Sequence, residues 1–243
     1  MRPVLPVLAL AGVLACASAG ALASRSQCTG RSASTLTPVI ELYTSEGCSS
    51  CPPADRWVSS LKTRAANGEV VVEAFHVGYW DYIGWVDRFA SPAYTARQRQ
   101  IASWNHQSGV YTPQLVRNGQ DWRDYSHALA SAGPARATIA VQRRSEDAFD
   151  AEVTPAEGVG AWGAYWTVTE NGHNSKVKAG ENAGEFLQHD FVVRQYVAAG
   201  EYHGPSKLTL RAIPVQVGHP RQVNLVVFDP RSGKPLQALS IGC

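Results

Sequence analysis

The sequence lacks several features that would point to particular partners. Its 22 basic and 20 acidic residues leave a formal charge of +2, which gives no indication of a nucleic-acid partner. The single methionine is Met1 and there is no histidine-rich tract, which weighs against copper carriage through those ligands. Beyond the first segment no apolar run is long enough to cross a bilayer. We therefore expect neither a nucleic-acid partner nor a membrane span.

The first segment has the pattern of a signal peptide. Arg2 supplies the positive start, residues 4–15 form a short apolar core, and Ala21-Leu22-Ala23 resembles a cleavage site. We expect residues 1–23 to be removed from an exported protein, periplasmic or secreted. A lipoprotein anchored through Cys16 is the alternative, although the residues around Cys16 fit that pattern poorly.

Cleavage would leave four cysteines, an even number in an oxidising compartment. Cys48 and Cys51 are a local pair, so we expect a second, structural disulfide between Cys28 and Cys243. The alternative is that Cys28 and Cys243 are separate thiols near the two ends of the chain.

The motif Cys48-Ser49-Ser50-Cys51 lies between a β-like run, residues 38–43, and a helix-like run that begins near Pro53. The positive end of a helix lowers the pKa of an adjacent thiol, and the thiolate is the nucleophile of thiol–disulfide exchange. The same spacing also occurs in zinc sites and in purely structural bridges.

The remaining patterns divide the chain at Gly133-Pro134. Before this boundary we predict a strand over 69–77, a helix from Ser91 to about His106, a hairpin around Asn118-Gly119 and a short helix over 124–132. After it, seven runs read as strands of an antiparallel sandwich: 137–143, 149–153, 164–169, 191–198, 207–212, 222–228 and 236–241.

The order of elements before the boundary is that of thioredoxin-like proteins, in which a cis-proline facing the CxxC motif begins a strand. Pro113, preceded by Thr112, stands at that position. Three segments further resemble an exported bacterial family known only as domain of unknown function 1223, of the thioredoxin-like superfamily: 41–55, 76–81 and 180–184.

The resemblance implies an α/β fold in two domains and implies no activity. The first, residues 38–133, would be thioredoxin-like, with a central mixed sheet flanked by helices. The second, residues 134–243, would be a mainly antiparallel β-sandwich.

These patterns suggest roles for individual residues. Cys48 would attack a substrate and be the more exposed of its pair, and Cys51 would resolve the mixed disulfide. A cis Pro113 and Thr112 would lie beside the substrate backbone. His76 could assist the thiols, join them as a metal ligand or be an interior histidine with its hydrogen bonds made.

Glu41 is one residue away from the strand position of the buried acid in thioredoxin. We expect it to be solvated or structurally paired.

The function that these residues favour is thiol–disulfide exchange on cysteine-containing proteins, with an unknown redox partner and no cofactor. One alternative is the handling of copper or another soft metal by Cys48, Cys51 and His76. The other is a non-enzymatic binding module in which Cys48–Cys51 is a structural disulfide.

Export leads to a direct prediction. The signal pattern implies that the mature chain begins at Ser24. Mass spectrometry of the protein recovered from its native host should give that N-terminus. A lipid on Cys16, or an intact Met1, would contradict the prediction.

Overall fold

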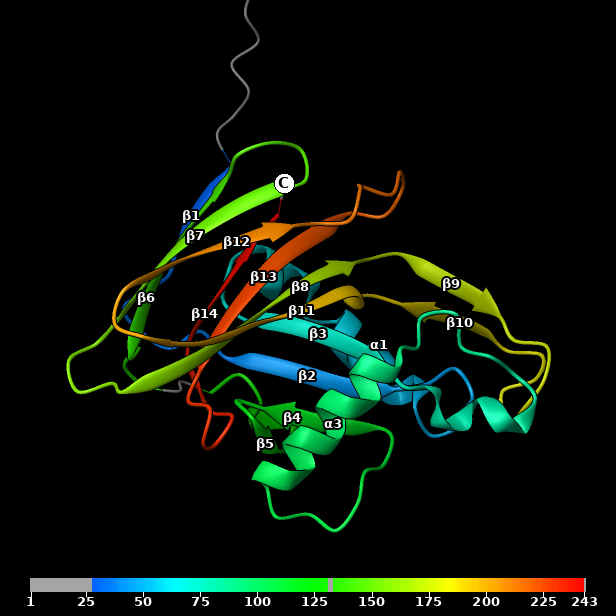
Figure 1. The fold of residues 1–243 in the computed structure, drawn as a ribbon. Helices are drawn as coiled ribbons and strands as arrows, with labels where there is room; N and C mark the ends of the chain where they lie inside the picture. The colour runs from blue at the N-terminus through cyan, green and yellow to red at the C-terminus, as the bar shows by residue number, and fades with distance from the viewer. Residues whose placement is uncertain (1–27, 131–132, 243) are drawn as a thin grey trace, which may run out of the picture.

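The computed structural model describes residues 28–130 and 133–242, which form three β-sheets and a few short helices (Figure 1). Strand residues outnumber helix residues, 42% to 16%. The predicted signal segment with Cys16, and Cys243 at the other end, lie outside the described residues.

The largest sheet has eight strands in the order β14-β13-β8-β11-β3-β2-β4-β5. Its middle is parallel, since β2 pairs with β3 and β3 pairs with β11 in that sense, and the other pairings are antiparallel. The strands are β2 Val39–Thr44, β3 Val71–His76, β4 Gln114–Arg117, β5 Gln120–Asp121, β8 Ala161–Glu170, β11 Val192–His203, β13 Arg221–Phe228 and β14 Pro235–Ile241.

Helices cover mainly the part of this sheet formed by β2, β3 and β4, and α3 also reaches β11, where Tyr94 Oη donates to Val193 O at 3.0 Å. On one face, α1 Pro52–Ser59 and α2 Lys62–Ala66 bury Val58 and Ala65 against Ile40 and Leu42. On the other face, α3 Pro92–Trp104 packs Ile101 against aromatic and branched side chains of the same strands. Alternate side chains of a strand point to opposite faces, so β2 contributes to both cores.

A second sheet of four strands, in the order β1-β6-β7-β12, covers the other half of the large sheet. Its strands are β1 Thr29–Arg31, β6 Ala137–Arg143, β7 Ala148–Pro155 and β12 Ser206–Arg211. Between the two sheets Ile139 and Phe149 pack with Trp162, Trp166 and Leu225, all at most 1% exposed. This is the main apolar core.

The third sheet is a hairpin of β9 His173–Lys176 and β10 Phe186–His189, which projects from the end of β8 and returns to β11 (Figure 1). It lies near the start of α1. Neither strand was expected from the sequence, because each has only four residues and β9 has no apolar side chain.

The expected α/β class, a thioredoxin-like domain followed by a separate sandwich, is wrong. The chain is mostly β, and strands from both sides of the Gly133-Pro134 boundary belong to one sheet. The physical reason is that β11 hydrogen-bonds to β3, with Ala74 N donating to Phe191 O at 2.8 Å. The domain limits 38–133 and 134–243 stay predictions.

Most predictions of individual helices, turns and strands are confirmed. The helix starting at Pro92 is present, and Ser91 Oγ accepts from Ala93 N at 3.3 Å. Asn118 and Gly119 form the predicted hairpin turn with φ of 50° and 75°. The seven runs after Gly133 are all strands. The predicted helix over 124–132 is instead a single 3-10 turn, η2 Tyr125–His127.

No helix in the described part of the chain has the length and apolar character needed to cross a membrane.

The first and last strands meet, which bears on the predicted second disulfide. A side chain at Gly30 of β1 would come within 2.5 Å of Ile241 Cγ2 at the end of β14. Cys28 stands two residues before Gly30 and packs against the main core. Since Cys243 lies outside the described residues, the Cys28–Cys243 bridge stays a prediction.

We expect peptide mapping without reduction to recover Cys28 and Cys243 in one cross-linked fragment. The double variant Cys28→Ser/Cys243→Ser should lose about 2–4 kcal/mol of unfolding free energy, because the bridge closes a very long loop. Urea unfolding measures the loss. Separate peptides without the cross-link would refute the pairing.

Candidate functional site

Cys48 and Cys51 form a disulfide, with a Cα–Cα distance of 5.4 Å, where the loop after β2 enters α1. The helix begins directly at Pro52, and the Cys51 carbonyl accepts from the amides of Ala54 and Asp55. Pro52 and Pro53 fit the first turn because the amides there have no partner within a helix. Because proline has no N–H, the first turn also offers two fewer donors to a thiolate.

Both cysteines are buried and their exposures barely differ, so the expectation that Cys48 is the more exposed of the pair stays a prediction. Cys48 is 1% exposed and Cys51 is 0% exposed. A segment 132 residues away covers the loop: Ser49 N donates to Glu181 Oε2 at 3.0 Å, and Asn182 Nδ2 donates to Cys48 O at 3.0 Å. Side chains from the β9–β10 hairpin therefore close the site.

The Thr112–Pro113 peptide bond is cis, as expected. Trp80, in the 3-10 helix η1 Gly78–Ile83, donates from Nε1 to Thr112 Oγ1 at 2.7 Å. A Cβ at Gly47 would lie 2.9 Å from Trp80 Cβ, so a side chain there would clash. Trp80 thus connects the loop that precedes Cys48 to Thr112.

His76, at the end of β3, is completely buried and bonds through Nδ1 to Asp87 Oδ2 at 2.7 Å. The same carboxylate oxygen accepts from Glu46 N at 2.9 Å, and Asp87 Oδ1 accepts from Phe89 N at 2.9 Å. Asp87 therefore ties the end of β3 to the loop that carries the disulfide.

Four polar atoms beside this pair are buried without a hydrogen-bond partner among the described residues: Glu46 Oε1, His76 Nε2, and Nδ1 and Nε2 of His189. Glu46 Oε2 accepts from Trp85 Nε1 at 2.7 Å. The 3.3 Å separation of His189 Nε2 and Glu46 Oε1 brings opposite charges close when His189 is protonated, but its geometry is not that of a hydrogen bond.

Burial and charge act in opposite senses on these groups. Burial by itself lowers the pKa of His76, but the Asp87 carboxylate outweighs it and the pKa is raised. Burial likewise would raise the pKa of Asp87, but the charge and hydrogen bond of His76 lower it. The pair is an ion pair over the pH range between the two pKa values.

Asp55 extends the ionisable cluster onto α1. It follows Cys51 by four residues, one helical turn, and both side chains are buried. Thr44 Oγ1 donates to Asp55 Oδ2 at 3.2 Å, and burial raises the pKa of Asp55. An acid with a raised pKa beside the disulfide is suited to accept and return a proton.

The alternative metal set of Cys48, Cys51 and His76 is not assembled. The sulfurs are bonded to each other and His76 Nδ1 is engaged by Asp87. Over residues 28–130 and 133–242, no group of three or more His, Cys, Asp or Glu side chains is arranged to hold a metal ion.

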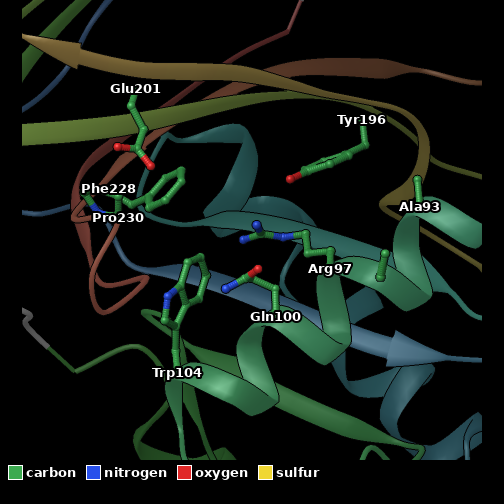
Figure 2. A pocket seen from close by; sticks show the side chains of 9 residues that line it. Ala93, Arg97, Gln100, Trp104, Tyr196, Glu201, Phe228 and Pro230 are labelled. Atoms are coloured by element: carbon green, nitrogen blue, oxygen red, sulfur yellow. The ribbon is translucent and has the colours of Figure 1, made fainter.

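A separate cavity of about 470 Å³ lies between α3 and the ends of β11 and β13 (Figure 2). Aromatic rings of Trp104, Tyr196 and Phe228 line it, and Arg97 and Glu201 are its charged residues. None of the residues predicted for the site belongs to it. The full lining is Ala93, Ala96, Arg97, Gln100, Trp104, Tyr196, Glu201, Phe228 and Pro230.

Arg97 connects this cavity to a buried charge network. It donates to both carboxylate oxygens of Glu41, at 2.7 and 2.9 Å, so Glu41 is structurally paired. Its neighbour Glu73 accepts from Tyr165 and Thr167, and burial followed by the charge of Glu41 raises the pKa of Glu73 to about 7. The network holds one guanidinium for two carboxyl groups.

Sequence reasoning missed most of the polar residues around the disulfide. Asp87 lies in the loop between η1 and α3, where a single acid gives no indication of a role. Glu46 and Asp55 flank the CxxC motif within a few positions, which is the one local signal that could have marked them. Nothing in the sequence relates His189 or Asn182 to Cys48.

Comparisons with known proteins give one family and two solved structures. The family described as "Protein of unknown function (DUF1223)" matches residues 39–228. A crystal structure of a protein from Agrobacterium tumefaciens is 25% identical, with a TM-score of 0.66, over 85% of this chain and 94% of that one.

A second solved structure, HBP35 of Porphyromonas gingivalis, is 12% identical with a TM-score of 0.59, over 86% of this chain and 76% of that one, and therefore shares the fold alone. A comparison with curated proteins gives no match.

The His76–Asp87 pair predicts how stability depends on pH. The raised pKa of His76 stabilises the fold below about pH 6.5, and this contribution is lost as the pH rises through the folded-state value. The lowered pKa of Asp87 stabilises the fold above about pH 4, and this contribution is lost as the pH falls through the folded-state value.

Asp87→Asn should therefore cost about 3 kcal/mol near pH 5.5 and less at alkaline pH, as measured by urea unfolding. The matched control is Asp124→Asn, since the exposed Asp124 pairs with His127 at 2.6 Å in water-screened surroundings and should change stability little at any pH. Equal effects of the two substitutions at every pH would refute the assignment.

Proposed function

The chain belongs to the DUF1223 family of proteins of unknown function, and from its site we propose that it performs thiol–disulfide exchange on cysteine-containing proteins. The observation that carries the proposal is a disulfide at the start of a helix whose neighbouring buried side chains include ionisable ones. Glu46, Asp55, His76 and Asp87 are all at most 6% exposed and lie around the loop and helix that hold Cys48 and Cys51. A disulfide that only stabilises the fold has no need of them.

The reaction is a balanced pair of exchanges. A substrate thiolate attacks Cys48 Sγ, a new disulfide bond forms, and the Cys48–Cys51 bond breaks with its electron pair on Cys51. A second substrate thiolate then attacks the substrate sulfur and releases Cys48. Two substrate thiols are oxidised to a disulfide while Cys48 and Cys51 are reduced, and the reverse reaction reduces a substrate disulfide.

Cys48 suits the role of attacked sulfur better than Cys51. It is followed by the exposed Ser49 and Ser50, whereas Cys51 leads directly into α1. Its Sγ lies 3.4 Å from Ser50 Oγ, which can donate a hydrogen bond to a thiolate. The half-buried Thr112 and the cis Pro113 join the same region through Trp80.

Proton transfer falls to Asp55. The Cys51 thiolate that leaves in the first step needs a proton, and Asp55 lies one helical turn away in the same buried environment. Its raised pKa lets it carry that proton at a higher pH than an ordinary aspartate. The buried His76–Asp87 pair keeps opposite charges beside it, so the cluster does not need bulk water to stabilise charge.

We propose that this exchange takes place after export, in the periplasm or outside the cell, where a thiol–disulfide partner of unknown identity restores the starting redox state.

The proposal predicts different behaviour for the two cysteine variants. Cys51→Ser should accumulate a mixed disulfide at Cys48 when mixed with a cysteine-containing peptide disulfide, whereas Cys48→Ser should accumulate none. Non-reducing electrophoresis and mass spectrometry give the readout, and urea unfolding checks that both variants fold. A wild-type disulfide that no thiol exchanges with, in a folded protein, would leave Cys48–Cys51 as a structural bridge.

A further inference from the structure

The turn between β9 and β10 is held to the disulfide loop by two side chains. We call residues 177–185 the cover turn. Glu181 Oε2 accepts from Ser49 N at 3.0 Å. Asn182 Nδ2 donates to both Glu46 O at 2.8 Å and Cys48 O at 3.0 Å. Three backbone groups at or next to Cys48 are thereby occupied: Glu46 O, Cys48 O and Ser49 N.

The cover turn has internal hydrogen bonds that do not involve the disulfide loop. Val177 N donates to Glu185 O, Gly184 N to Val177 O and Glu185 N to Asn182 O. Gly180 and Gly184, with φ of 75° and 94°, let the chain reverse twice within five residues. The segment is therefore a preformed unit that can leave the loop without unfolding.

The cover turn also makes apolar contacts. Val177, at its start, is 1% exposed and anchors the base of the turn. A Cβ at Gly180 would lie 3.1 Å from Ile83 Cδ1, and one at Gly84 would lie 3.7 Å from Ala179. The same Ile83 side chain reaches toward Gly47. Farther along the turn, Glu181 is exposed and Asn182 is 5% exposed, and these two side chains hold the backbone around Cys48.

The occupied groups are the ones that an approaching peptide would use. An extended chain binds through alternating N–H donors and C=O acceptors, and Ser49 N, Cys48 O and Glu46 O offer one donor and two acceptors next to the sulfur. Glu181 and Asn182 supply a carboxylate and an amide, the same acceptor and donor types as a peptide backbone.

We propose that the cover turn is a built-in competitor for the substrate chain. Glu181 and Asn182 hold the backbone groups of residues 46–49 until a cysteine-containing protein displaces them, and only then does a thiolate reach Cys48 Sγ. The inference rests on the proposed function, since it names the regulation of the same disulfide.

The test measures how fast a small phosphine reduces the disulfide in the full chain, followed by alkylation and mass spectrometry of the peptide that contains Cys48 and Cys51. Glu181→Ala and Asn182→Ala should each speed reduction roughly tenfold, the shift expected when one or two hydrogen bonds of ordinary net strength are lost. Thermal melts check folding. Glu181 is exposed, so its variant decides the outcome if Asn182→Ala is unstable.

Charge needs a separate control, because removing an acid also reduces repulsion of an anionic phosphine. Glu181→Gln keeps an acceptor for Ser49 N and should stay within about twofold of the wild type, since its hydrogen bond survives. Glu185→Ala and Asn174→Ala, exposed positions on the same hairpin, should also leave the rate unchanged. The proposal would be overturned if the phosphine reduced Glu181→Ala at the wild-type rate. It would also be overturned if Glu181→Gln accelerated reduction as much as Glu181→Ala.

The same variants separate this inference from the proposed function. If the cover turn regulates access but the protein does not exchange disulfides, phosphine reduction accelerates while a cysteine-containing peptide forms no mixed disulfide with any variant. If exchange occurs without regulation, the peptide reacts equally fast with the wild type and with Glu181→Ala.

Discussion

The pairing of β11 with β3 joins the two parts of the chain that the sequence patterns assign to separate domains, and most of the architecture depends on it. It places Val192 opposite Ala74 and continues through β8, β13 and β14 into one eight-stranded sheet. The β9–β10 hairpin lies between β8 and β11 in the chain. The pairing of β11 with β3 therefore also fixes the position of the hairpin beside α1. Without that pairing neither His189 nor Asn182 would reach the disulfide loop.

The sheet carries two buried clusters of ionisable side chains, which differ in how their charges are compensated. Glu41 is matched by two hydrogen bonds from Arg97, while the neighbouring Glu73, with a pKa raised to about 7, is largely neutral below that pH. The second cluster, at the carboxyl ends of β2 and β3, has Asp87 and His76 as its ion pair. It also retains buried atoms on Glu46, His76 and His189 that have no hydrogen-bond partner within residues 28–130 and 133–242.

This difference is why the second cluster is the better functional candidate. Buried polar groups in folded proteins are nearly always hydrogen-bonded, and the exceptions concentrate where chemistry occurs. Arg97 and Glu41 satisfy each other and support packing. The His76 cluster surrounds a disulfide bond that can be broken and remade, so groups that change protonation there can transfer the protons that the exchange requires.

Local patterns in the sequence determined the start of α3, the Asn118-Gly119 hairpin, the strands after Gly133 and the pairing of Cys48 with Cys51, because each depends on neighbouring residues. The cis Thr112–Pro113 bond was expected from the resemblance to thioredoxin-like proteins and is present. Only the tertiary structure decided the single large sheet, the burial of Cys48, and the meeting of Asp87, His189 and Asn182 around it. These depend on contacts between residues more than 130 positions apart, such as Asn182 with Glu46 and His189 with Glu46, for which no local pattern in one sequence carries a signal.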